Sequence, residues 1–167
     1  MATQFDYRST STYPADEVYA TMVDPDYLRA RLAEIGGPGA ALLEHSADTD
    51  TARYRLRHGI DPEKLPSLIR TVLPREVVIE RTETWRRQGV GDYTGDIRVT
   101  IPGTPGSATG AMRLRDTDGG SELHIRIEVT VNVPLLGGKV ESMVSGHIKD
   151  LLASESAFTQ QWLAQRG

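Results

Sequence analysis

Apolar and polar residues alternate along two stretches in the second half of the chain. From Tyr93 to Ile101 and from Leu123 to Val133, the odd-numbered positions are apolar or small, whereas the even-numbered positions are polar or charged. Because successive side chains point to opposite faces of a strand, this pattern predicts strands with one covered face and one face in water. We therefore expect an antiparallel sheet that is packed on one side only.

Turn-forming residues divide the middle of the chain into three predicted hairpins. The turns lie at residues 47–50, 88–90 and 116–120 and separate runs with strand-like patterns. The six strands of these hairpins are predicted at residues 40–46, 51–59, 77–87, 91–101, 107–115 and 122–133. A seventh strand is predicted at residues 5–13, where Phe5, Tyr7 and Tyr13 share one face.

Helical patterns precede, interrupt and follow these strands. Proline and acidic residues open a pattern at residues 14–22, and a second short helix is predicted between Pro25 and Gly36. Another short helix is predicted within residues 61–73, where apolar residues recur at helical spacing. The longest pattern runs from residue 138 to residue 165, which corresponds to a helix roughly 42 Å long. A helix of that length can cross the whole sheet.

Small residues mark the start of this last helix. Pro134 cannot donate a hydrogen bond to a strand ladder, so it ends the last strand. Gly137 and Gly138 are expected to let the backbone turn and approach the sheet closely, at some cost in helix propensity. We interpret this segment as the hinge at which the helix enters the covered side of the sheet.

Composition and charge narrow the class of protein. At 167 residues the chain can bury a sizeable core, so residues 1–167 are expected to form one domain. The absence of cysteine excludes disulfides and thiolate metal sites. Without a signal-peptide pattern or a run of ~20 apolar residues, a cytoplasmic protein with no integral membrane segment is expected. The 19 basic and 23 acidic residues are scattered, which argues against nucleic-acid binding.

The order of the predicted elements resembles that of the START-like superfamily, also called the helix-grip or birch-pollen-allergen-like fold. Residues 133–141, followed by Glu155, Phe158 and Trp162, are similar to an uncharacterised actinobacterial family within it. The resemblance implies an α+β fold in which a curved antiparallel sheet of about seven strands wraps around the long helix. It also implies a cavity between sheet and helix, where members bind lipids, sterols, polyketides or other apolar molecules.

Motifs for catalysis are missing from the sequence. There is no Gly-x-Ser-x-Gly nucleophile motif and no cysteine to replace it. The four histidines are widely spaced, and none stands with another histidine or an acid at a metal-binding spacing. We therefore predict no catalytic residue, no metal site and no cofactor, and we expect a hydrophobic small molecule as the partner.

One predicted strand carries charges on the face that should be covered. If Trp85 lies inside, strict alternation places Arg81 and Glu83 inside as well, where charges must be paired or face a cavity. Together with Tyr93 they could hold the head group of an otherwise apolar ligand. A bulge that shifts the register and places both charges in water is an equally good interpretation.

The large and polar residues of the inner faces complete the candidate site. His147 lies beside the apolar stripe of the last helix, where a neutral imidazole can exchange a proton, although a histidine hydrogen-bonded to a strand or to water is the favoured interpretation. Most of the large residues also fit an ordinary core. The predicted ligand-binding residues are Arg81, Glu83, Trp85, Tyr93, Met112, Met143, His147 and Leu151.

Three functions are compatible with this pattern. The first is binding of a hydrophobic ligand without catalysis, because few aromatic residues and several small ones leave room inside. The second is an enzyme like the polyketide cyclases, with Arg81, Glu83, Tyr93 or His147 polarising a carbonyl. The third is a protein-interaction module with a filled core and an outer arginine face, although interleaved acids favour a solvated, salt-bridged face. The identity of the ligand and the oligomeric state do not follow from the sequence.

Overall fold

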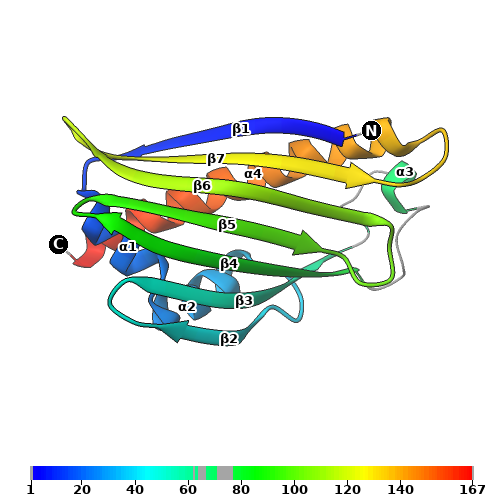
Figure 1. The fold of residues 1–167 in the computed structure, drawn as a ribbon. Helices are drawn as coiled ribbons and strands as arrows, with labels where there is room; N and C mark the ends of the chain where they lie inside the picture. The colour runs from blue at the N-terminus through cyan, green and yellow to red at the C-terminus, as the bar shows by residue number, and fades with distance from the viewer. Residues whose placement is uncertain (1, 62, 64–66, 71–76, 167) are drawn as a thin grey trace.

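A computed structural model of the chain describes residues 2–61, 63, 67–70 and 77–166. Its elements follow one another in the predicted order (Figure 1). They are β1 (Ala2–Ser11), α1 (Ala15–Met22), α2 (Pro25–Ile35), β2 (Ala41–Ala47), β3 (Thr51–Ile60), α3 (Ser67–Arg70), β4 (Val77–Gly89), β5 (Asp92–Thr100), β6 (Gly106–Thr117), β7 (Gly120–Val131) and α4 (Gly137–Arg166).

The seven strands form one antiparallel sheet in the order β1-β7-β6-β5-β4-β3-β2. Every neighbouring pair except β1 with β7 consists of consecutive strands, so hairpins build most of the sheet. The helix α4 runs along one face of the sheet, and α1 and α2 lie on the same side (Figure 1). The predicted α+β helix-grip architecture is thereby confirmed.

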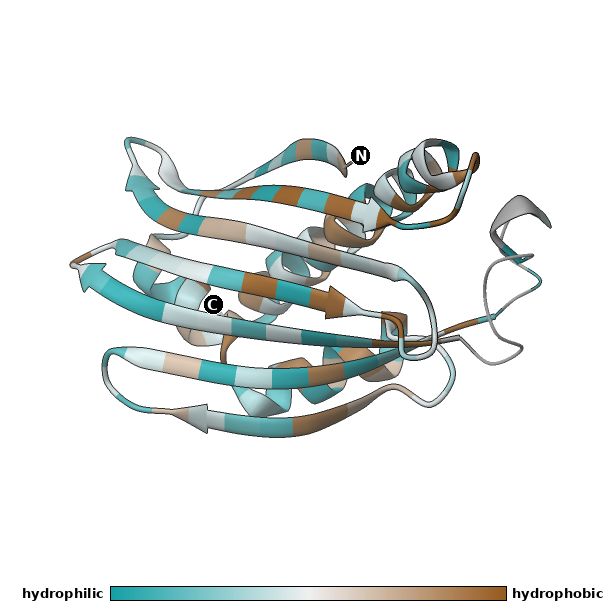
Figure 2. Ribbon diagram, turned by 45° about the vertical axis from the view of Figure 1, so that its right-hand side comes forward, coloured by the Kyte–Doolittle hydropathy of each residue, from teal (hydrophilic) through white to brown (hydrophobic). Residues whose placement is uncertain are grey.

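Hydrophobic and hydrophilic residues alternate along strands of the sheet (Figure 2), and the burial of alternate residues in β5 and β7 assigns them to its two faces. The inward residues Tyr93 and Ile97 of β5 are buried, as are Ile125, Ile127 and Val129 of β7. Burial of these side chains against α4 supplies the main driving force for folding. The core therefore lies between one face of the sheet and the three helices α1, α2 and α4.

The register of β4 decides between the two interpretations of its charged residues. Pairing with β3 is continuous, and the shift against β5 occurs only between Arg87 and Gly89. No bulge lies near Arg81 or Glu83 in the described strand, so both side chains stay on the inner face beside Trp85. The interpretation in which a bulge places these charges in water is therefore wrong.

Element ends differ from the prediction by a few residues. The strand β7 ends at Val131, two residues early, although the amide of Asn132 still donates to the carbonyl of Pro105 on the neighbouring segment at 3.2 Å. The helix α3 lies within the helix predicted for residues 61–73, of which residues 62, 64–66 and 71–73 are outside the described part of the chain.

The hinge before α4 works differently from its prediction. A Cβ on Gly137 would lie 2.6 Å from the carbonyl oxygen of Val131, so this close approach does require glycine. A Cβ on Gly138 would meet nothing within 4 Å. The turn itself is made by Leu135, whose φ of 67° is unusual for a residue with a side chain. The predicted role of Gly138 is therefore wrong, because its surroundings are open.

Ion pairs cover the outer face of the sheet. Arg55 lies between Glu44 and Glu80, with shortest N–O distances of 3.2 and 3.7 Å. Arg8 pairs with Glu122 at 3.0 Å, and similar pairs link Arg113 to Asp92 and Arg126 to Asp6. The arginines of this face thus alternate with acids, as in an ordinary solvated sheet surface. Among the described helices, none is long and apolar enough to cross a bilayer.

Candidate ligand-binding site

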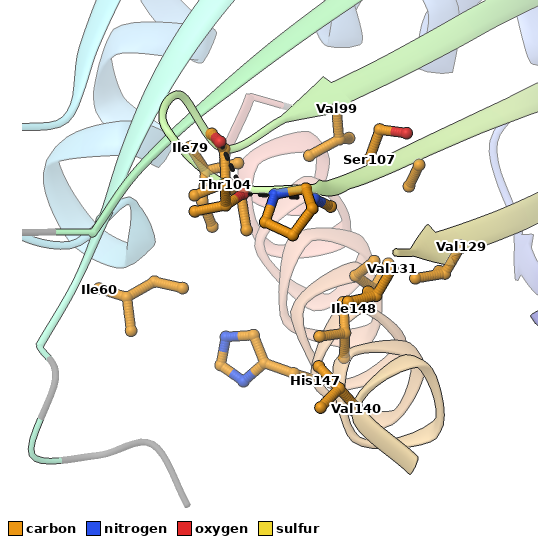
Figure 3. A pocket seen from close by; sticks show the side chains of 15 residues that line it. Ile60, Ile79, Val99, Thr104, Ser107, Val129, Val131, Val140, His147 and Ile148 are labelled. Atoms are coloured by element: carbon orange, nitrogen blue, oxygen red, sulfur yellow. Dashed lines mark hydrogen bonds between the residues drawn. The ribbon is translucent and has the colours of Figure 1, made fainter. Parts of the chain in front are cut away.

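A cavity opens between the sheet and the first half of α4 (Figure 3). Its volume is about 80 Å³, and it opens to solvent. Most of its walls are aliphatic side chains. The lining residues are Ile60, Ile79, Val99, Ile101, Thr104, Pro105, Gly106, Ser107, Ala108, Val129, Val131, Val140, Val144, His147 and Ile148.

Short side chains explain why this space stays open. Val140, Val144 and Ile148 follow one another at four-residue spacing, so they form a stripe on α4 that faces the sheet. Opposite them, Ala108 and Val129 project from paired positions of β6 and β7. These side chains are too short to meet across the gap, and an apolar surface is left uncovered. Such a surface favours an apolar ligand over water.

The other end of the same interface is filled by aromatic rings. Tyr19 of α1 stacks on Tyr93 of β5 with 3.9 Å between the ring centroids, and its edge meets Trp85. Tyr27 of α2 packs against Phe158 and Trp162 of α4. We call this region the aromatic end. It closes the interface on the side of α1 and α2, so the cavity can open only at the opposite side.

Few polar groups reach the cavity from its described walls. The Thr104 hydroxyl donates to the carbonyl of Ile101 at 2.7 Å, so the loop already satisfies its proton. His147 is exposed on α4, and its ring points toward the space between the helix and Ile60 (Figure 3). A ligand would therefore meet aliphatic walls inside and one imidazole at the mouth.

The structure distributes the eight predicted ligand-binding residues over several places. His147 lines the cavity. Arg81, Glu83 and Met112 line a smaller void of about 30 Å³ beside Glu155. Trp85 and Tyr93 belong to the aromatic end. Met143 and Leu151 lie half-buried on α4, outside the cavity lining.

Four buried charges form an ion cluster beneath α4. Arg81 contacts Glu83 through Nε at 2.8 Å and donates from Nη1 to both carboxylate oxygens of Glu155, at 2.7 and 2.9 Å. Arg31 of α2 lies 3.7 Å from the same Glu155. All four side chains are almost completely buried. Because the cluster contains two arginines and two glutamates, its charges balance, which makes their burial possible.

The charges also determine how the cluster titrates. Burial by itself raises the pKa of Glu155, but the nearby charges of Arg31 and Arg81 outweigh this effect and lower that pKa to about 2. Burial likewise lowers the pKa of Arg81, and the attraction of Glu155 and Glu83 more than reverses the shift. The pair Arg81–Glu155 therefore stays ionised at neutral pH.

A hydrogen-bond relay extends the ion cluster into the sheet. The indole of Trp85 donates to the Tyr54 hydroxyl at 3.2 Å, and this hydroxyl donates to Glu83 at 3.0 Å. Burial first, and then the charge of Glu83, raise the pKa of Tyr54 well above its ordinary value. The phenol thus remains protonated and keeps donating. The relay fixes the Glu83 carboxylate toward Arg81.

The sequence prediction of a polar group formed by Arg81, Glu83 and Tyr93 needs a correction. Tyr93 donates its hydroxyl proton to Asp16 of α1 and is not part of the ion cluster. The missing members are Arg31 and Glu155, which sequence reasoning did not select. The signal available in the sequence was a charged residue within the apolar stripe of a helix, Arg31 in α2 and Glu155 in α4. A charge in such a position needs a buried partner.

The residues considered for catalysis are not gathered around one point. His147 lines the cavity, Arg81 and Glu83 line the void beside Glu155, and Tyr93 lies against α1. A reacting carbonyl within reach of one of these groups would not also be within reach of all the others. The described geometry consists of an apolar cavity and, separately, a self-contained ion cluster.

Comparisons with known proteins agree with this fold. The family described as "Protein of unknown function (DUF2505)" matches residues 6–163. The uncharacterized protein Rv0481c of Mycobacterium tuberculosis is 26% identical over 170 residues, which cover 98% of each chain.

Solved structures with the same fold are more distant in sequence. Ara h 8.0201 has a TM-score of 0.62 at 14% identity, with 99% of each chain covered. The protein TTHA0849 from Thermus thermophilus has a TM-score of 0.63 at 11% identity over 100% of this chain and 99% of that one. Norcoclaurine synthase from Thalictrum flavum has a TM-score of 0.58 at 13% identity over 98% and 87%. At such identities the likeness establishes the START-like fold only.

Proposed function

The chain belongs to the family of proteins of unknown function DUF2505, and for this member we propose the binding of a hydrophobic small molecule between the sheet and α4. The observation that carries the proposal is the aliphatic cavity, which opens between the sheet and the first half of α4. Each CH₂ group that a ligand moves from water into such a site contributes about 0.8 kcal/mol. A lipid-like or polyketide-like molecule fits this chemistry.

The dimensions of the cavity limit how such a ligand would lie. The cavity volume of about 80 Å³ is well below the roughly 300–1,000 Å³ of sites that enclose a whole small molecule, so only one end of such a ligand would lie inside. The ligand would insert one end among the aliphatic side chains of the cavity, which include Val99, Ala108 and Val129. Its other end would lie at the mouth beside His147.

The predicted site residues have different roles in this proposal. His147 is the one that we expect to contact a ligand directly, through a polar group at the mouth. The other seven are expected to support the site: Arg81 and Glu83 hold β4 to α4, and the remaining five pack the interface around it. A cytoplasmic location, expected from the sequence, remains part of the proposal.

Filling the cavity tests the proposed function. Ala108 lies buried on the inner face of β6, so Ala108→Phe would place a ring in the space that the ligand needs. We expect the affinity for the neutral apolar dye N-phenyl-1-naphthylamine to fall by about tenfold or more, since excluding two CH₂-sized groups suffices for this loss. The measurement is the fluorescence titration of the dye with purified protein.

Ala111→Phe is the matched control for this experiment. Ala111 lies on the same strand but on the exposed outer face, so its substitution should leave dye binding unchanged. Equal affinities of wild type and Ala108→Phe, or no dye binding by the wild type, would contradict the proposed function. Native mass spectrometry of the protein from its own host would then identify the molecule that it carries.

A further inference from the structure

His58 is a buried histidine without a hydrogen-bond partner in the described part of the chain. Its side chain is only 4% exposed, and neither Nδ1 nor Nε2 has a partner among the described residues. A neutral imidazole carries one donor and one acceptor, and leaving both unused inside a protein is unfavourable. Most buried polar groups in proteins have a hydrogen-bond partner. A ligand that supplies one would therefore stabilise this ring.

In the sheet, His58 lies close to residues of the ion cluster and to residues that line the cavity. On β3 it is the inward residue before Ile60, about 7 Å away along the strand. Across the β3–β4 pair it stands directly opposite Ile79. Both isoleucines line the cavity and are only half-buried. His58 itself is not among the lining residues, so contact with a ligand would require Ile60 or Ile79 to move aside.

The charges around His58 restrict the chemistry of such a partner. Arg81, Glu155 and Arg31 are the charged groups that act on the ring. A ligand cation would be repelled by the two arginines, and a carboxylate would add an uncompensated charge to a balanced cluster. A neutral oxygen carries no such penalty. A hydroxyl group can donate to or accept from the ring, and a keto oxygen can accept from its N–H.

We propose that His58 is the inner polar contact of the ligand and binds a neutral hydroxyl or keto oxygen at its inserted end. This inference rests on the proposed function, because it requires a ligand in the cavity. It narrows the ligand class to apolar molecules with a neutral oxygen at the buried end. Hydrocarbon tails without an oxygen, and free fatty acids inserted carboxylate first, would bind less well.

A pair of matched probes tests this contact. Naphthalene and 2-naphthol share the same rigid apolar body, and 2-naphthol adds one hydroxyl that is neutral at pH 7. Their affinities are measured by displacement of N-phenyl-1-naphthylamine from wild type and from His58→Leu. We expect the ratio of 2-naphthol affinity to naphthalene affinity to fall about tenfold in His58→Leu, because one hydrogen bond is lost. The anion 2-naphthoate should bind to wild type more weakly than 2-naphthol.

Controls separate this inference from the proposed function. His124→Leu removes a histidine from the outer face and should keep the wild-type ratio. An unchanged ratio in His58→Leu, with naphthalene bound, overturns the inference and leaves the proposed function intact. Failure of naphthalene to bind wild type contradicts the proposed function and this inference with it. Thermal melting verifies that His58→Leu is folded, and His58→Phe replaces it if it is not.

Discussion

At the scale of single residues, inward-facing polar groups distinguish this protein from a plain apolar sandwich. Arg31, Arg81, Glu83 and Glu155 balance one another's charge, whereas His58 beside them finds no hydrogen-bond partner for either ring nitrogen among the described residues. Burial first, and then the charge of Arg81, lower the pKa of His58 from its ordinary value of 6.5 to about 4. The folded protein therefore holds this ring neutral.

The neutral state of His58 predicts a loss of stability in mild acid. Above pH 6.5 the ring is neutral in the folded and unfolded chains, and it contributes no pH dependence. Between pH 6.5 and about 4 the unfolded chain takes up a proton that the folded chain excludes, so the free energy of unfolding falls as the pH falls. The shift corresponds to a loss on the order of 3 kcal/mol.

Urea unfolding from pH 7 to pH 4 measures this effect. His58→Leu should lose less stability over this range than wild type, and the two curves should run in parallel above pH 6.5. Below pH 4.5 both proteins should lose further stability, because Glu155 has a pKa of about 2 when folded and 4.5 ordinarily. Identical slopes for wild type and His58→Leu between pH 6.5 and 4 would contradict the assignment.

At the scale of elements, Glu155 joins three of them. It lies on α4 and contacts Arg81 of β4 and Arg31 of α2, so one carboxylate holds the long helix to both the sheet and a second helix. Such a contact is sensitive to the loss of either partner, because an unpaired buried charge cannot return to water. The exposed ion pairs of the outer face have no comparable role.

Removing the charge of Glu155 should therefore be costly. Glu155→Gln leaves the two buried arginines with only Glu83 to compensate them, and we expect the free energy of unfolding to fall by about 3–5 kcal/mol. Asp96→Asn, in the exposed pair with Arg86, is the matched control and should cost less than about 1 kcal/mol. Similar losses in both variants would show that the ion cluster adds nothing beyond a surface pair.

The entry of α4 gives a second prediction at this scale. Gly137→Ala would force a Cβ to 2.6 Å from the carbonyl oxygen of Val131, so we expect it to destabilise the fold by about 1–3 kcal/mol. Gly138→Ala meets open space and should stabilise the helix by up to about 1 kcal/mol. Thermal unfolding of the two variants should shift in opposite directions, and a shift in the same direction would contradict this account of the hinge.

At the scale of the whole molecule, the interface between sheet and α4 has two unlike ends. Aromatic rings fill the end at α1 and α2, and short aliphatic side chains leave the other end open. The sequence analysis selected Trp85, Tyr93 and Met112 for the ligand site because they are large and face inward. Large side chains are the ones that close space, so the cavity lies instead among valines, isoleucines and Ala108.

The sequence alone was sufficient for the order of the elements and for the face on which each strand residue lies. Alternation and helical period are local properties, and they hold wherever one face of an element is covered. For Arg81 and Glu83 the same rule left two interpretations open, and the register of β4 decided between them. Only the tertiary structure decided which inward residues meet, since Arg31, Arg81 and Glu155 come from segments far apart in the chain. The cavity likewise depends on how side chains from separate strands and one helix fill a shared space, and local patterns carry no information about that fit.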